Sequence, residues 1–212
     1  AEGYMAGGAE TIMGQAFQEL GLPREQYLIS TKVFNGGKTP NEQGLSRKHI
    51  IEGVNRSLKR YGTEYFDLVY AHLQDKECPI EETVWSFNQL IKQGKALYWG
   101  TSNWSAVDIM KAELFARSEG LLGPSMEQTE YSILKRYRFE KEFDILYQVL
   151  GMGTTTYSPL ASGVLSGKYN QGKVPEGSRA TVPAYQWMRD SVLDQAKIKV
   201  AEKLAPIAAD LG

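Results

Sequence analysis

The sequence predicts an α/β protein in which helices pack against a sheet of parallel strands. Short runs rich in β-branched and aromatic residues alternate with amphipathic helical stretches, and the pattern recurs about every 30 residues. Several strand runs are almost continuously apolar, which is typical of parallel strands that are buried on both faces. Two architectures fit this alternation: an open, doubly wound sheet and a closed (β/α)8 barrel.

The expected strands are short and evenly distributed. They are expected at residues 27–33, 65–71, 96–101, 125–129 and 152–157. Between residues 168 and 185 the pattern is lost, which predicts one long loop.

The expected helices fill the intervals between the strands. An opening helix is expected over residues 10–20 and a closing one over 200–211. Over residues 46–61 apolar side chains recur every three or four positions, and Ser46 is suited to cap the amino end. The helix expected over 80–91 carries two glutamates in its first turn, where the helix dipole favours negative charge.

Counting these units distinguishes a complete barrel from a partial one. Five strand–helix units are recognisable, whereas a closed barrel needs eight. As a barrel, residues 1–212 are therefore expected to form one partial domain. It would lack the first two strands and the last strand–helix unit.

Composition excludes several classes of function. The chain is 42% hydrophobic and 23% charged, and its 24 basic and 25 acidic residues give a net charge of −1. This balance predicts no nucleic-acid partner. The apolar runs are far too short for a membrane-inserted segment. The single cysteine, Cys78, and the lack of a signal peptide favour a reducing, cytoplasmic setting. Two unclustered histidines and one cysteine predict no metal site.

Polar or aromatic side chains follow each expected strand at the same relative place. They are Lys32, His72, Ser102 with Asn103, Gln128, and Tyr157 with Ser158. Ligands gather at the carboxyl ends of parallel strands in either architecture. The set therefore predicts a ring of functional groups around one pocket, although strand ends are often polar simply because they meet water.

Tyr4, Lys32 and His72 together suit proton donation to a carbonyl oxygen. A free phenol is a weak acid with a pKa near 10, and a neighbouring cation favours its ionised form. An imidazole beside the hydroxyl can orient the carbonyl. Lys32 alone leaves open a second chemistry, a Schiff-base aldolase. The other histidine, His49, lies in a polar turn and is expected on the solvated surface.

Several stretches, in order along nearly the whole chain, resemble the aldo-keto reductases. The resemblance is greatest to the branch that contains the β subunits of voltage-gated potassium channels and their plant and microbial relatives. The matching stretches are AEGY (1–4), ISTK (29–32), GLSRKHIIEG (44–53), PIEET (79–83), YWGTS (98–102), EQ (127–128), YSPLASG (157–163) and GKY (167–169).

This resemblance implies a (β/α)8 barrel with a catalytic Asp, Tyr, Lys and His, of which Tyr4, Lys32 and His72 match the last three. In animal channel subunits the histidine position is commonly asparagine, so His72 favours an active reductase. The family aspartate is expected two residues before Ala1. The segment that binds the adenosine 2′-phosphate is expected beyond Gly212. A polypeptide limited to these residues is therefore expected to be inactive.

The resemblance also implies bound NADPH in an extended pose. Ser102, Asn103 and Gln128 match the residues that bind the nicotinamide carboxamide in this family. Tyr157 matches the aromatic residue that stacks on the nicotinamide ring. Residues matching the pyrophosphate clamp are Ser158, Pro159, Leu160, Ala161, Ser162, Lys168 and Arg179.

Two functions follow as expectations. The first is NADPH-dependent reduction of a small aldehyde or ketone, with tyrosine as the proton donor. The alternative is a regulatory, redox-sensing subunit of a voltage-gated potassium channel, with bound NADPH and slow turnover. The resemblance also makes a homotetramer an open expectation.

Overall fold

Five parallel strands form the sheet in the computed structural model, which describes residues 1–212. The strands are β1 (Ser30–Val33), β2 (Phe66–Ala71), β3 (Ala96–Ser102), β4 (Met126–Gln128) and β5 (Gly153–Thr154). Each strand pairs with the next one along the chain, so the order is β1-β2-β3-β4-β5. A doubly wound sheet reverses its strand order at a switch point. These five strands contain no such reversal.

The chain divides into two units. The sheet unit comprises Ala1–Thr129 and Glu142–Thr155, and the C-terminal unit comprises Glu130–Lys141 and Thr156–Gly212. The expectation of a single domain over 1–212 stays a prediction.

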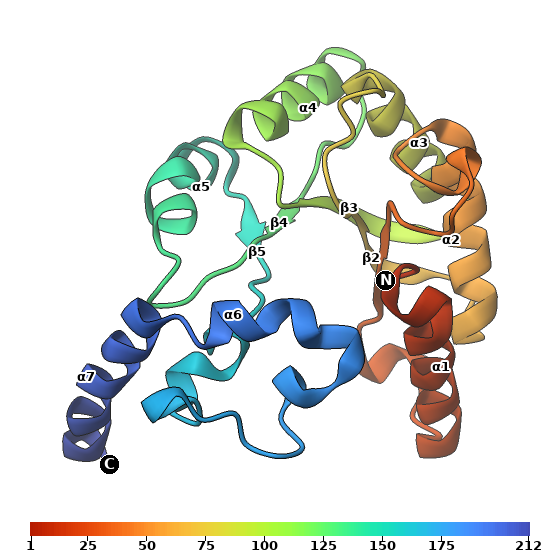
Figure 1. Cartoon of the computed structure of the whole chain (residues 1–212). Helices are drawn as coiled ribbons and strands as arrows, with labels where there is room; N and C mark the ends of the chain where they lie inside the picture. The colour runs from red at the N-terminus through yellow and green to blue at the C-terminus, as the bar shows by residue number, and fades with distance from the viewer. The chain divides into compact units, whose positions relative to one another are not determined.

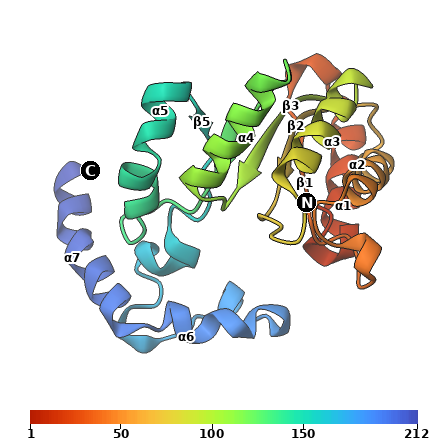
Figure 2. The ribbon, with the colours of Figure 1, turned by 90° about the horizontal axis from the view of Figure 1, so that it is seen from above.

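The helices of the sheet unit form one layer. They are α1 (Gly8–Leu20), α2 (Arg47–Tyr61), α3 (Ile80–Lys92), α4 (Ala106–Ser118) and α5 (Asp144–Leu150). Each of these helices packs against the next. They succeed one another along one side of the sheet (Figures 1 and 2). The helices therefore cover one face of the sheet.

Local sequence signals explain where α2 begins and ends. The Ser46 side chain accepts a hydrogen bond from the His49 amide over 3.2 Å, as expected of a helix cap. The helix ends at Gly62, which adopts the left-handed conformation with φ of 66°. Between these ends, Val54 and Leu58 contribute to the core of the unit. The predicted helix is therefore confirmed.

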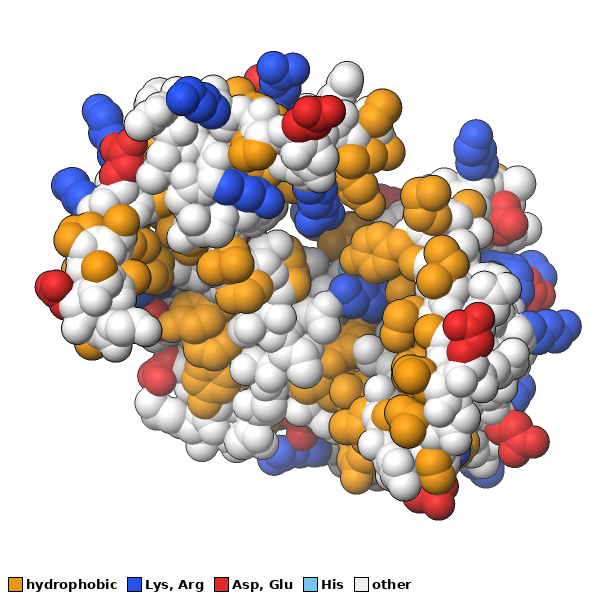
Figure 3. All heavy atoms as spheres, turned by 90° about the horizontal axis from the view of Figure 1, so that it is seen from below, with side chains coloured by type: hydrophobic (Ala, Val, Ile, Leu, Met, Phe, Trp, Pro, Cys, Tyr) orange, Lys and Arg blue, Asp and Glu red, His pale blue; other side chains and the backbone are white.

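Helix α1 packs closely against α2 through a glycine. A Cβ atom at Gly14 would lie 2.6 Å from the Tyr61 carbonyl oxygen, so no larger residue fits there without movement. The buried residues of α1 are only Glu10 and Gly14. Apolar side chains are exposed on the side of the sheet unit where α1 lies (Figure 3). These include Ile12, Met13, Leu20 and Leu22.

Four of the five predicted strands are shorter in the structure, and the strands predicted over 27–33 and 152–157 lose the most residues. The prediction of a strand over 27–33 is wrong at its start, because the Ile29 amide donates to the Asp67 side chain over 2.7 Å. The ladder therefore begins at Ser30. The predicted strand over 152–157 shrinks to β5, and Tyr157 instead forms an isolated bridge with Glu130.

The C-terminal unit holds α6 (Arg189–Val192) and α7 (Gln195–Leu211), which contains the predicted closing helix. Its core consists of Val164, Tyr169, Ala180, Val192 and Ala201. The predicted loop over 168–185 is irregular apart from short 3-10 turns. In neither unit does a helix combine the length and the apolar character that crossing a membrane requires.

Candidate functional site

The strand ends bring several predicted site residues to one edge of the sheet. Ser102 at the end of β3 is paired with Gln128 at the end of β4. The Asn103 amide donates to the Gln128 carbonyl oxygen over 3.1 Å. His72 follows β2 directly, and its amide donates to the Val33 carbonyl oxygen at the end of β1 over 3.1 Å. Sequence-distant polar groups thus share one edge because the strands are parallel and in register.

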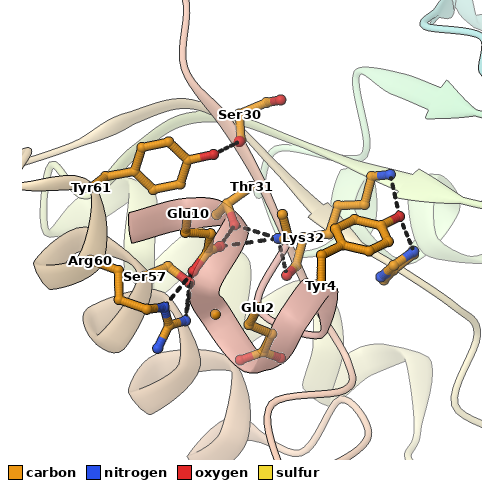
Figure 4. A network of polar contacts seen from close by, with 12 residues as sticks. Glu2, Tyr4, Glu10, Ser30, Thr31, Lys32, Ser57, Arg60 and Tyr61 are labelled. Atoms are coloured by element: carbon orange, nitrogen blue, oxygen red, sulfur yellow. Dashed lines mark hydrogen bonds and ion pairs between the residues drawn. The ribbon is translucent and has the colours of Figure 1, made fainter. Parts of the chain in front are cut away.

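Tyr4, Lys32 and His72 meet at this edge. The Lys32 Nζ donates to the Tyr4 hydroxyl over 3.4 Å, and the same hydroxyl lies 3.5 Å from His72 Nε2. The contact between Tyr4 and Lys32 is drawn in Figure 4. Tyr4 is 48% exposed, so its hydroxyl is held between a cation and an imidazole while remaining accessible to a ligand.

Burial and the nearby positive charge of Lys32 lower the pKa of His72 to about 4. The imidazole is therefore neutral at physiological pH. A neutral ring can donate from one nitrogen and accept at the other. This suits a group that orients a hydrogen-bonding partner beside the tyrosine hydroxyl.

The lowered pKa predicts a pH-dependent cost in stability. The unfolded chain binds a proton at His72 near pH 6.5 and the folded chain only near pH 4, so stability falls as the pH drops between these values. When the pH falls from 7 to 5, the unfolding free energy of the wild type should drop by about 1 kcal/mol more than that of His72→Asn, which lacks the imidazole. This figure allows for the partial exposure of His72. Urea unfolding at both pH values measures this. Equal losses in the two proteins would contradict it.

Ser102, Asn103 and Gln128 form a group of hydroxyl and amide side chains. Ser102 is fully buried, and its Oγ accepts a hydrogen bond from Asn103 Nδ2 over 3.1 Å. Asn103 has a φ of 60°, a left-handed conformation that asparagine tolerates better than most residues. A carboxamide needs both donors and acceptors, and this set supplies both.

A chain of hydrogen bonds orients the Gln128 amide. Gln128 Nε2 donates to Thr155 Oγ1 over 3.0 Å. The same Thr155 hydroxyl lies 2.9 Å from the hydroxyl of Tyr70, a buried residue of β2. Sequence reasoning missed Tyr70 and Thr155. No sequence signal singled them out, because tyrosine and threonine are common in strands.

The predicted pyrophosphate residues lie in the C-terminal unit. Ser158, Ala161 and Ser162 have φ values between 48° and 58°, so this loop turns repeatedly through the left-handed conformation. Such turns can aim backbone N–H groups at an anion. In this loop, however, the Ala161 and Gly163 amides donate to the Ser158 and Leu160 carbonyl oxygens over 2.8 and 2.9 Å. A pocket of about 340 Å³ in this unit is lined by Ala161 and Ser162 together with Lys135 and Lys197.

The other predicted cofactor residues of this unit lie near the loop or farther along the chain. A Cβ at Gly163 would come within 2.4 Å of the Lys168 side chain, which places Lys168 beside the loop. The Arg179 guanidinium stacks 4.6 Å above the centre of the Tyr185 ring. Tyr157 is partly buried, and its carbonyl oxygen accepts from the Tyr131 amide over 3.2 Å. The roles of these residues toward a cofactor stay predictions.

The expectation that His49 lies on the solvated surface is wrong. Its side chain is fully buried, and Nε2 lies 2.8 Å from Glu2 Oε1. The flanking polar residues suggested a solvated turn. His49, Gly53 and Ser57 follow one another at intervals of four residues, which places them on one face of a helix. All three are buried in α2, so this spacing is the signal that could have placed His49 correctly.

Besides Glu2, which precedes Tyr4, a second carboxylate that follows Tyr4 in the chain is buried. Glu10 is fully buried, and its side chain accepts hydrogen bonds from the Thr31 hydroxyl over 2.5 Å and from Arg60 Nε over 2.7 Å (Figure 4). Thr31 precedes Lys32 in β1, so this network fixes α1 against the strand that carries Lys32. Sequence reasoning missed it, since a carboxylate in an expected helix is normally solvent-exposed.

Comparison with known proteins identifies the family. The family model described as "Aldo/keto reductase family" matches residues 1–212. A protein of Oryza sativa subsp. japonica is 48% identical over 212 residues, and one of Arabidopsis thaliana is 49% identical over 212 residues. Both are named "Probable voltage-gated potassium channel subunit beta". The matches cover 100% of this chain and 65% of the length of each relative. The chain belongs to the aldo/keto reductase family.

Proposed function

We propose that this chain contributes five strands to a (β/α)8 barrel that reduces aldehydes or ketones with NADPH. The sequential order of parallel strands and the one-sided layer of helices support the barrel. The observation that carries the reaction is the Tyr4 hydroxyl, which lies within 3.5 Å of both Lys32 Nζ and His72 Nε2.

The three side chains divide the work on a carbonyl substrate. Tyr4 donates a proton to the carbonyl oxygen, and the Lys32 ammonium stabilises the negative charge that develops on the phenol oxygen. The neutral His72 imidazole orients the substrate oxygen beside the hydroxyl. Bound NADPH would supply the hydride. The protein contributes positioning and electrostatic stabilisation.

The donor and acceptor set at the ends of β3 and β4 fits a nicotinamide carboxamide. We assign Ser102, Asn103 and Gln128 to hold it, with Tyr157 against the ring. The loop Ser158, Pro159, Leu160, Ala161 and Ser162, with Lys168 and Arg179, is assigned to the pyrophosphate. The backbone turns and lysines of the C-terminal unit support this assignment.

Gln128→Leu is expected to weaken NADPH binding, because it removes an oriented amide. Loss of one net hydrogen bond raises the Kd about threefold to tenfold. Titration of NADPH fluorescence with the full-length protein measures the change. Gln148→Leu alters an exposed glutamine of α5 and is the matched control. Equal Kd values for Gln128→Leu and the wild type would remove Gln128 from the site.

The reductase proposal is tested by NADPH oxidation with 4-nitrobenzaldehyde in the full-length protein. A loss of NADPH absorbance that occurs only when the aldehyde is present supports the proposal, provided that the alcohol is formed. Absence of turnover with a panel of aldehydes and ketones, in protein that binds NADPH, would refute it.

The names of the relatives favour a second candidate. As a channel-associated regulatory subunit, the protein would act in the cytoplasm and bind the cytoplasmic part of a voltage-gated potassium channel. Homotetramer formation belongs to this proposal. Co-purification with a channel's cytoplasmic domain, and the mass of the assembly in solution, test it. Clean failure to bind would count against it, whereas reductase turnover would be compatible with either role.

A further inference from the structure

The Glu2 carboxylate occupies a closely fitted socket in the sheet unit. The side chain is 1% exposed. Its Oε1 accepts a hydrogen bond from the Phe34 amide over 2.9 Å and lies 2.8 Å from Nε2 of the fully buried His49. Phe34 follows β1 and His49 belongs to the first turn of α2, so the socket joins the segment before α1 to two other elements.

Two glycines make room for this carboxylate. A Cβ at Gly36 would lie 2.7 Å from Glu2 Oε2 and also 2.7 Å from His49 Cε1. A Cβ at Gly53 would lie 2.9 Å from Glu2 Oε2. Residues with a side chain at either position would displace the carboxylate or the imidazole. The socket therefore admits the Glu2 side chain in essentially one position.

The socket is not an optimal way to gain stability. Glu2 Oε2 and His49 Nδ1 are buried without a hydrogen-bond partner. An unsatisfied buried polar atom is costly, and apolar replacements of buried polar pairs are often neutral or stabilising. A buried pair that is only partly satisfied is better explained by the single arrangement that it imposes on the backbone.

The segment that Glu2 anchors carries Tyr4, two residues later. Tyr4 is 48% exposed and Met5 77% exposed, so neither side chain gains much packing of its own. Met5 and Ala6 have φ values of 53° and 51°, which is a strained conformation for residues other than glycine. The position of the Tyr4 hydroxyl thus depends on anchors outside the turn.

We propose that the Glu2–His49 pair positions the Tyr4 hydroxyl between Lys32 and His72, so that His49 is a positioning residue for proton donation. The proposal rests on the reductase function inferred above. Neither Glu2 nor His49 touches the reacting atoms. They act by holding the backbone of residues 2–4 against the strand that carries Lys32.

Two substitutions at His49 separate hydrogen bonding from packing. His49→Leu fills a similar volume but removes the donor, whereas His49→Gln places an amide N–H near the position of Nε2. Leu58→Ala is the matched control, because it destabilises the same helix nine residues away, about 13 Å along the axis. All are made in the full-length protein and compared with the wild type by thermal unfolding.

Hydrogen exchange of the peptide covering residues 1–7 is the readout that needs no activity. His49→Leu is expected to speed exchange in this peptide at least tenfold, whereas His49→Gln and Leu58→Ala leave it within about threefold of the wild type. Equal protection of the peptide in His49→Leu and Leu58→Ala would overturn the proposal.

A double-mutant cycle with Tyr4→Phe provides the kinetic readout. His49→Leu alone is expected to slow hydride transfer roughly a hundredfold, as misplacement of about 1 Å can do, with little change in the Kd for NADPH. In that background Tyr4→Phe should cost less than tenfold, because the hydroxyl is already misplaced. The same factor for Tyr4→Phe in both backgrounds would refute positioning.

Gly36→Ala covers the case in which His49→Leu does not fold. It crowds the carboxylate without removing either partner and should produce the same pair of effects. Gly153→Ala is its control, since the nearest atom to that added Cβ is 3.9 Å away. If Tyr4→Phe alone reduces carbonyls as fast as the wild type, the proposed reductase mechanism fails. The hydrogen-exchange result then decides by itself whether the Glu2–His49 pair holds residues 1–7.

Discussion

Replacing Tyr4 by phenylalanine is expected to lower the rate of carbonyl reduction by about 10²-fold to 10⁴-fold, the usual contribution of a general acid. The change removes only the hydroxyl that lies between Lys32 Nζ and His72 Nε2. Single-turnover reduction of 4-nitrobenzaldehyde by prebound NADPH measures the chemical step directly. The Kd for NADPH should stay within about twofold of the wild type, since the cofactor groups are assigned to other strands.

Tyr27→Phe is the control for loss of a tyrosine hydroxyl in the same unit. Tyr27 stacks on Phe17 with ring centroids 4.5 Å apart and precedes the amino end of β1, away from the candidate site. Its rate should match the wild type. Equal rates for Tyr4→Phe and the wild type would remove Tyr4 as the proton donor, and another acid would then have to be found.

The parts of the fold that the sequence predicts well are those set by local chemistry. Helix α2 begins after the Ser46 cap and ends at Gly62, and both signals lie within its own sequence. The start of β1 could not be predicted in this way. It depends on the Asp67 side chain in β2, 38 residues later in the chain, which accepts a hydrogen bond from the Ile29 amide.

The candidate site shows the same division. Lys32, His72 and Gln128 could be predicted to share one edge of the sheet, because parallel strands place their carboxyl ends at the same edge. The helical spacing to Gly53 and Ser57 could place His49 on the buried face of α2, but its pairing with Glu2, 47 residues earlier, could not be predicted. The role of a residue that supports others is recognised only once the long-range pairings are known.

The largest loss of stability is expected for Trp99→Ala. Trp99 is fully buried in β3, stacks on Phe87 of α3 with centroids 4.9 Å apart, and donates from Nε1 to the Leu122 carbonyl oxygen over 2.9 Å. Truncation leaves a large cavity and removes one of the two hydrogen bonds that the Leu122 carbonyl oxygen accepts, the other coming from Asn88 Nδ2. The cost should therefore be about 3–5 kcal/mol. Urea unfolding monitored by far-UV circular dichroism measures it.

Trp99→Phe separates packing from hydrogen bonding, since it keeps an aromatic ring against Phe87 but loses the indole donor. It should cost clearly less than the alanine variant, about 1–2 kcal/mol. Trp85→Ala is the control, because Trp85 lies on α3 but is 43% exposed, and it should cost about 1 kcal/mol or less.

Since Trp99 lies three residues before Ser102 in β3, the two side chains point to opposite faces of the sheet. Trp99→Phe should therefore loosen the helix-facing side while leaving the Kd for NADPH almost unchanged. A comparable cost for Trp85→Ala and Trp99→Ala would show that α3 is not anchored to the sheet through this stacked pair.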